Sequence, residues 1–125
     1  MSDAYIDVFL NFRNLLKIYH WKTKSYARHI ASDNLVKGID GLIDQFMEVY
    51  FGKYEVNAKK LTRMKTTFEL GDDDAFVDKE LAFFKDIVIP EMKALLKPDA
   101  DADLYNILDE MSALVNQTIY LFRLN

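Results

Sequence analysis

One histidine and four carboxylates stand at helical spacing between residues 29 and 48. Their separations of four, seven, four and four residues keep side chains on one face of a helix, and we call this set the polar stripe: His29, Asp33, Asp40, Asp44 and Glu48. Imidazole and carboxylate together form the ligand set of iron, manganese or zinc at redox and hydrolytic sites. A solvated helix face can give the same pattern, but such faces usually mix in lysine, and only Lys37 interrupts this one. The stripe therefore favours a metal site, with a solvated face as the alternative.

The length of the helix divides this stripe into two parts. Asp44 and Glu48 are one turn apart and could hold the same ion. His29 precedes Asp44 by fifteen residues, which is about 22 Å along a continuous helix. One chain cannot close that gap, whereas a second, antiparallel copy related by a two-fold axis would bring its own His29 beside these carboxylates. The spacing thus predicts a metal site shared between two subunits.

The other histidine, His20, is followed by the only tryptophan, Trp21. A lone histidine near a helix end is most often structural. Two histidines on either side of a short link, just ahead of a carboxylate pair, shift the balance toward ligation by His20. Trp21 could pack on such a site or fill a plain core position.

Most other carboxylates have structural explanations. The acidic runs at Asp72–Asp74 and Asp99–Asp103 precede predicted helices, where carboxylates cap free N–H groups and suit the helix dipole. Further along each helix, acidic side chains are expected on solvated faces: Asp78, Glu80, Asp109 and Glu110.

Length and composition indicate one globular domain over residues 1–125, with 50% hydrophobic and 29% charged residues. The absence of cysteine excludes disulfides, zinc ribbons, iron–sulfur clusters and thiol nucleophiles, and fits a reducing compartment. No apolar run approaches the roughly 20 residues that cross a bilayer, and the N-terminus lacks the pattern of a signal peptide. We therefore expect no membrane contact and a cytoplasmic protein.

The net charge of −4 argues against a broad nucleic-acid interface. The basic stretch Lys59–Lys65 is the best local candidate, but no aromatic residues alternate with its charges. Cationic metal ions and further copies of the chain are the expected partners instead.

Helical periodicity runs through most of the chain, which has only four glycines and two prolines. It predicts an all-α, four-helix bundle with helices over residues 3–22, 25–51, 73–97 and 101–123. Two positions stay open for the break between the first two helices: Thr23–Ser25 or Ser32–Asp33.

The third predicted helix contains Pro90, which should kink it or end it early. Its apolar face is predicted to consist of Phe76, Phe83 or Phe84, Ile87, Met92 and Leu95. Before it, the irregular stretch Gly52–Gly71 is long enough to run the length of a bundle. This stretch predicts a long crossover between the second and third helices, a recognised bundle topology.

Taken together, the motifs from residue 20 to residue 48 resemble the ferroxidase hairpin of Dps-type mini-ferritins, in the ferritin-like superfamily. That family has a His-Trp pair ending its first helix, a His-x-x-x-Asp opening its second, and an Asp-x-x-x-Glu fifteen residues after the second histidine. The matching residues here are His20-Trp21, His29, Asp33, Asp44 and Glu48. The resemblance implies a ferritin-like bundle and puts the helix break near Thr23–Ser25.

The resemblance also implies a function. Two histidines and an aspartate of one subunit would face the Asp-Glu pair of its dimer mate. Fe(II) would bind there and be oxidised by peroxide or dioxygen, and iron would be stored in a hollow oligomer such as a dodecamer. Asp40 would lie next to this site.

Three departures from the family pattern concern the site, the chain ends and the larger ferritins. The link between His20 and His29 is three residues shorter than usual and lacks its glycine. There is no lysine-rich tail to bind DNA, and the Glu-x-x-His pairs of larger ferritins are absent. The rival hypothesis is a ferritin-like fold that serves as a structural or particle-associated interaction module without metal chemistry.

Overall fold

The computed structural model describes residues 2–54 and 73–124. The elements in these ranges are α1 (Ser2–Lys22), α2 (Tyr26–Lys53), α3 (Asp73–Phe83), the π-helix η1 (Phe84–Val88), α4 (Ile89–Ala94) and α5 (Ala102–Phe122). Because α3, η1 and α4 follow one another without a break, they form one rod, here called the third rod. The prediction of an all-α protein with four helices is confirmed for the described residues. None of these helices is both long enough and apolar enough to cross a bilayer.

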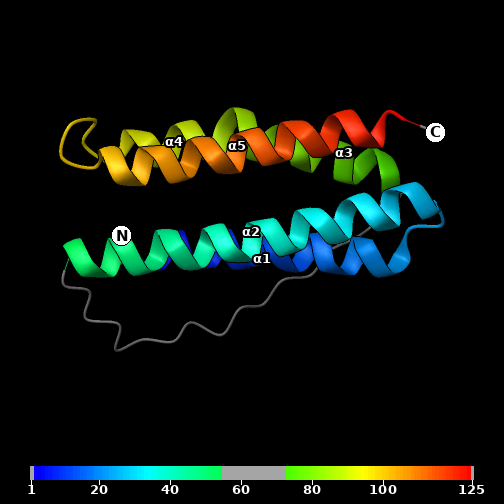
Figure 1. The fold of residues 1–125 in the computed structure, drawn as a ribbon, viewed down its shortest axis with the longest axis horizontal. Helices are drawn as coiled ribbons and strands as arrows, with labels where there is room; N and C mark the ends of the chain where they lie inside the picture. The colour runs from blue at the N-terminus through cyan, green and yellow to red at the C-terminus, as the bar shows by residue number, and fades with distance from the viewer. Residues whose placement is uncertain (1, 55–72, 125) are drawn as a thin grey trace.

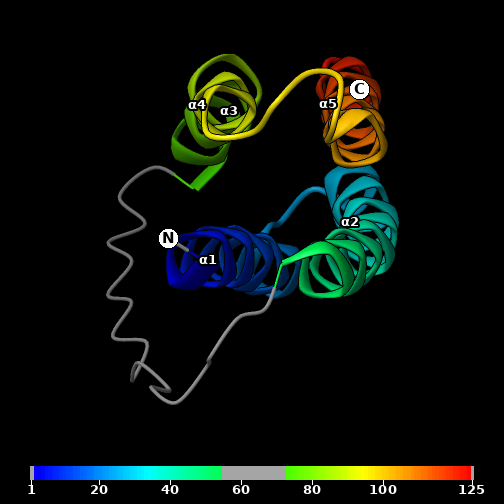
Figure 2. The same ribbon diagram turned by 90° about the vertical axis from the view of Figure 1, so that its left-hand side faces the viewer.

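Viewed along its axis, the molecule has α1, α2, α5 and the third rod at the four corners of a bundle (Figure 2). α1 and α2 form an antiparallel hairpin, and α5 packs beside α2. α2 ends at one end of the bundle and α3 begins at the other, so these two helices run in the same direction (Figure 1). Of the predicted crossover Gly52–Gly71, residues 52 and 53 belong to α2, and residues 55–71 lie outside the described residues.

The break between the first two helices lies at residues 23–25. Ser25 is the N-cap of α2, and its hydroxyl accepts a hydrogen bond of 3.2 Å from the Arg28 backbone N–H. From Tyr26 the helix runs unbroken to Lys53. The alternative break at Ser32–Asp33 is therefore wrong, and Ser32 is buried inside the helix.

Each rod turns one apolar face toward the centre of the bundle. Side chains with essentially no exposed surface come from all four rods: Phe9, Leu16 and Tyr19; Leu35, Ile39 and Phe46; Val77 and Leu81; Leu104, Leu108, Met111 and Val115. Burial of one large apolar side chain contributes about 1.5–3 kcal/mol to stability. Phe12 on α1 and Phe84 on η1 stack with ring centroids 3.9 Å apart, which joins α1 to the third rod.

The third rod continues through Pro90 because a π-turn precedes the proline. The Ile89 N–H donates to the Phe84 carbonyl, five residues back instead of four. The wide turn keeps both of these residues buried and rotates Ile87 to solvent, where it is 42% exposed. The predicted early end at Pro90 is wrong, and so is the placement of Ile87 and Leu95 on the apolar face. The prediction failed because it assumed a regular period of 3.6 residues, whereas the π-turn contains one more residue than an α-helical turn.

Candidate functional site

Two histidines close the hairpin between α1 and α2. His20 lies in the last turn of α1 and His29 in the first turns of α2. The Nδ1 atom of His20 is 2.8 Å from the His29 carbonyl oxygen, and the Nδ1 atom of His29 is 2.8 Å from the His20 carbonyl oxygen. The two rings stack with centroids 4.0 Å apart. These reciprocal contacts, here called the histidine clasp, hold both rings in place.

The clasp also decides which ring nitrogen carries the proton. A carbonyl oxygen only accepts, so each Nδ1 donates, and in the neutral ring the lone pair is then on Nε2. Ser32 fits this pattern, because its hydroxyl donates to the His29 carbonyl and lies 3.3 Å from His20 Nδ1. Metal-binding histidines usually donate their other N–H to a carbonyl or carboxylate in this way. The clasp thus presents two Nε2 lone pairs on stacked rings.

Asp33, one turn after His29, adds a carboxylate to the clasp. Its Oδ1 atom is 3.9 Å from His20 Nε2, and its Oδ2 atom is 2.9 Å from the Lys37 ammonium. The hydrogen bond from Lys37 holds the pKa of Asp33 below its usual range. The structure therefore gathers His20, His29 and Asp33 in one place, which we call the candidate half-site. In this structure the positive charge next to Asp33 is the ammonium group of Lys37.

The rest of the polar stripe lies elsewhere on α2. Asp44 and Glu48 are exposed near its second half, and neither has a hydrogen bond or ion pair within the described residues. Asp40 is held by Arg13 of α1, whose guanidinium nitrogens are 3.0 Å and 3.4 Å from the two carboxylate oxygens. In the described ranges, no three histidine, aspartate or glutamate side chains form a group that could enclose a metal ion. A single chain therefore supplies only part of a ligand set.

Trp21 follows the clasp but is not a core residue. Its side chain is 67% exposed, and the Lys17 ammonium lies 5.6 Å from the ring centroid. The plain core role that the sequence allowed is therefore wrong for this tryptophan. Its indole remains on the surface beside the end of α1.

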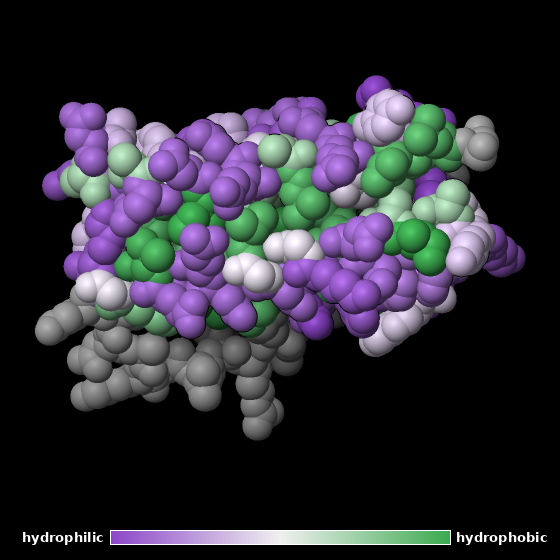
Figure 3. Space-filling model, in the orientation of Figure 1, coloured by the Kyte–Doolittle hydropathy of each residue, from purple (hydrophilic) through white to green (hydrophobic). Residues whose placement is uncertain are grey.

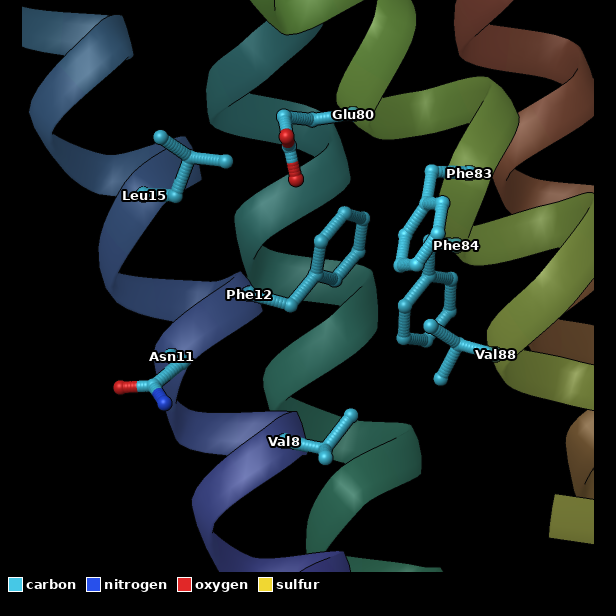
Figure 4. Close-up of a pocket in the computed structure, with 8 residues that line it drawn as sticks. All are labelled: Val8, Asn11, Phe12, Leu15, Glu80, Phe83, Phe84 and Val88. Carbon is cyan, nitrogen blue, oxygen red and sulfur yellow. The ribbon is translucent and has the colours of Figure 1, made fainter. Parts of the chain in front are cut away.

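An apolar cavity of about 220 Å³ lies between α1 and the third rod (Figure 4). Phe12 and Leu15 on α1 and Phe83, Phe84 and Val88 on the third rod line most of it. None of the predicted ligands is among its lining residues. This cavity therefore adds nothing to the half-site.

Similarity to known proteins gives a family but no activity. A family model described as "Family of unknown function (DUF5856)" matches residues 20–122. The chain belongs to this family. It is 26% identical over 128 residues to an "Uncharacterized 14.6 kDa protein in mobD-ri intergenic region" of Enterobacteria phage T4, a match that covers 98% of this chain and 88% of that protein. No solved structure matches, and because the family is not described as a ferritin, the mini-ferritin resemblance stays a hypothesis.

An arginine network that the sequence does not indicate joins all four rods of the DUF5856 chain. Arg28 donates to the Tyr19 hydroxyl at 3.0 Å and to both carboxylate oxygens of Asp78 at 3.0 Å and 3.3 Å. Its guanidinium lies 4.5 Å from the Phe122 ring centroid, and Tyr19 in turn donates to Asp74 at 2.7 Å. The sequence predicts a cap for Asp74 and a solvated face for Asp78, and misses these contacts. Partners so distant in the chain leave no spacing signal.

A buried carboxylate of the DUF5856 chain, Asp101, fastens the opposite end of the bundle. It is 1% exposed and accepts hydrogen bonds from the Lys97 backbone N–H at 2.8 Å and the Tyr54 hydroxyl at 2.6 Å. The Lys53 ammonium is 3.3 Å away. The bonds from Lys97 and Tyr54, with Lys53, lower the pKa of Asp101. Asp101 occupies the N-cap position of α5, but its side chain makes no cap hydrogen bond, so the capping role predicted for it is wrong.

Proposed function

We propose that this DUF5856 protein binds Fe(II) at a site shared between two antiparallel copies and oxidises it there. The observation that carries the proposal is the histidine clasp, because its Nδ1 bonds leave a lone pair on the Nε2 atom of each neutral ring, and His20 Nε2 lies 3.9 Å from the Asp33 carboxylate. One half of the proposed site consists of His20, His29 and Asp33. The other half consists of Asp44 and Glu48 of a second copy.

The geometry of α2 supports the need for a second copy. The helix is continuous from Tyr26 to Lys53, so His29 and Asp44 are separated by about 22 Å of helix axis. Asp44 and Glu48 are exposed carboxylates without partners in the described chain. Two antiparallel α2 helices would bring the two halves together at both ends of the contact.

Lys37 supports the idea that the half-site accepts a cation. Its ammonium now neutralises Asp33 from a side chain that is 74% exposed. Exposed ion pairs of this kind contribute little to stability, so a divalent ion can displace the lysine at small cost. In the proposed complex Asp33 turns from Lys37 to the metal.

The donor set suits iron, because imidazole and carboxylate ligands accommodate both Fe(II) and Fe(III). Fe(II) is the substrate in this proposal, and peroxide or dioxygen is the oxidant. With peroxide, two Fe(II) ions each give up one electron, the O–O bond breaks, and two protons complete two water molecules. The Fe(III) product collects in a hollow oligomer, such as the dodecamer that the ferritin-like resemblance implies, in the cytoplasm.

Anaerobic titration of the purified full chain with Fe(II) tests the proposal. Wild type is expected to bind Fe(II) saturably, and Asp44→Ala with Glu48→Ala is expected to abolish that binding. Glu110→Ala, which removes an exposed carboxylate from α5, is the matched control and keeps wild-type binding. Equal binding by wild type and the double variant would refute the site.

A second candidate is a structural or particle-associated module without metal chemistry. The specific observation in its favour is that the clasp already satisfies both Nδ1 groups and closes the hairpin without any ion. Among the described residues, no buried side-chain nitrogen or oxygen lacks a partner. Metal analysis of protein purified without chelator, together with the mass of the assembly, separates the two candidates. Iron in a cage supports the first, and a metal-free dimer or filament supports the second.

A further inference from the structure

Gly41 lies in the middle of α2 with no role inside the chain. It is exposed, its φ is not positive, and a Cβ atom added to it would meet no atom of the described chain within 4 Å. Glycine is the poorest helix former after proline, so an exposed mid-helix glycine weakens the helix without any intrachain benefit. A contact with another molecule would explain why a glycine occupies this position.

Gly38, one turn earlier, differs from Gly41 because it allows a close contact inside the chain. A Cβ atom there would lie 2.5 Å from a terminal methyl of Leu114, so this glycine lets α2 and α5 approach each other. The two glycines therefore face different neighbours. Gly38 serves the contact with α5, and Gly41 leaves a gap on the outer surface.

Large apolar side chains are exposed at both ends of the same outer face of α2. Tyr26 is 72% exposed and Ile30 is 44% exposed near its start, and Phe51 is 43% exposed near its end. Figure 3 shows apolar surface among the hydrophilic side chains on the side of the molecule that α2 and α5 form. These three side chains leave apolar surface at both ends of one helix face, which a second molecule packed along that face would cover.

The pattern along this face is self-complementary. In an antiparallel pair of identical helices, residues at equal distances on either side of the two-fold point lie opposite each other. Three pairs share one midpoint, between residues 38 and 39: Tyr26 with Phe51, His29 with Glu48, and Asp33 with Asp44. Lys37 and Gly41 are symmetric about residue 39, within half a residue of that point.

We propose that a second copy of this chain packs antiparallel along α2, with Gly41 receiving the aliphatic stem of the second copy's Lys37. This inference rests on the two-copy arrangement of the proposed function and adds the packing that holds the copies together. The outer rings Tyr26 and Phe51 stack across the interface at each end. Because lysine stems readily lie along apolar surface, the missing side chain at Gly41 gives Lys37 its place.

Sedimentation equilibrium of the full chain, in EDTA and again with Mn(II), tests this interface. Gly41→Gln should raise the dissociation constant by about tenfold or more in both conditions, since the added side chain overfills the contact. Its circular dichroism should stay helical, because glutamine is the better helix former. Ala75→Gln, an exposed position on α3 across the bundle from α2, is the control and leaves association unchanged.

The outcomes separate the two proposals. A Gly41→Gln protein that associates like wild type, or a wild type that is monomeric in both buffers, would overturn the interface. Weakened association by Gly41→Gln together with absent Fe(II) binding by an associated wild-type protein would support the interface and refute the proposed function. Normal Fe(II) binding by a fully associated Gly41→Gln protein would refute the interface and support the proposed function.

Discussion

Each histidine of the clasp uses its Nδ1 atom to close the α1–α2 turn, and its Nε2 atom makes no hydrogen bond within the described residues. Because the same bonds fix the hairpin and set the tautomer, both imidazole rings are positioned by the fold itself. Asp33 is less constrained, since its carboxylate forms an ion pair with the exposed ammonium group of Lys37. Residue by residue, the half-site is an imidazole pair with one exchangeable carboxylate.

Asp101 makes the residue-scale prediction. Asp101→Asn should lower the free energy of unfolding by about 2 kcal/mol at pH 7, because a buried charged acceptor of three hydrogen-bonding groups is lost. In wild type the folded-state pKa of Asp101 lies below its ordinary value. Its contribution is therefore present above that ordinary value and is lost as the pH falls through the folded pKa. Urea unfolding from pH 7 to pH 2.5 measures both effects.

The control for that series is Asp99→Asn, an exposed aspartate in the same turn. It should unfold like wild type at every pH. An Asp101→Asn protein whose stability at pH 7 matches that of Asp99→Asn would contradict the assigned role of the buried carboxylate.

Among the elements, the third rod departs most from its sequence pattern. Its buried residues Phe84 and Ile89 are five positions apart, and the π-turn is what allows both to face the core. Pro90, which lacks an N–H, follows that turn directly, where a regular helix would bring its ring against the carbonyl of residue 86. The wide turn therefore accommodates the proline ring and also places both apolar side chains in the core.

Deletion of Asp86 together with Pro90→Ala tests this explanation. Asp86 is exposed within the π-turn, and its removal leaves an ordinary α-helical spacing with the core residues in phase on both sides. The variant should fold, with a free energy of unfolding within about 1 kcal/mol of wild type. Deletion of the exposed Lys79 in α3 is the control and should abolish cooperative thermal unfolding, because every later core residue of the rod rotates away. Equal loss in both deletions would contradict the account of the π-turn.

Local signals in the sequence were enough for most of the elements. Ser25 caps α2 through an atom only three residues away, and the polar stripe needed only helical spacing to be found. What escaped prediction depends on contacts between distant residues. Asp101 meets Tyr54 across 47 positions, and Tyr19 meets Asp74 across 55, so neither pair leaves a periodic trace. The π-turn escaped because one inserted residue looks like noise in a helical pattern.

At the scale of the whole molecule, the outer face of α2 has a symmetric arrangement of residues that contacts within one chain do not explain. α2 carries His29 and Asp33 of one proposed half-site and Asp44 and Glu48 of the other. His29 and Asp44 are about 22 Å apart along the helix, with exposed apolar residues near both ends of α2 and Gly41 near the centre. Tyr26 with Phe51, His29 with Glu48, and Asp33 with Asp44 are symmetric about one point of the helix, and Lys37 with Gly41 about a point half a residue away. An antiparallel dimer explains them together, and the iron proposal depends on that dimer.

Complementation between inactive variants tests the shared site most directly. A His29→Ala copy lacks one half-site, and an Asp44→Ala, Glu48→Ala copy lacks the other, so neither binds Fe(II) alone. Each mixed dimer regains one intact site, and random exchange of subunits should restore roughly a quarter of the wild-type capacity. Anaerobic Fe(II) titration of the separate and mixed proteins is the measurement. Recovery on mixing is the predicted result, and no recovery despite exchange of subunits would contradict a site built from two copies.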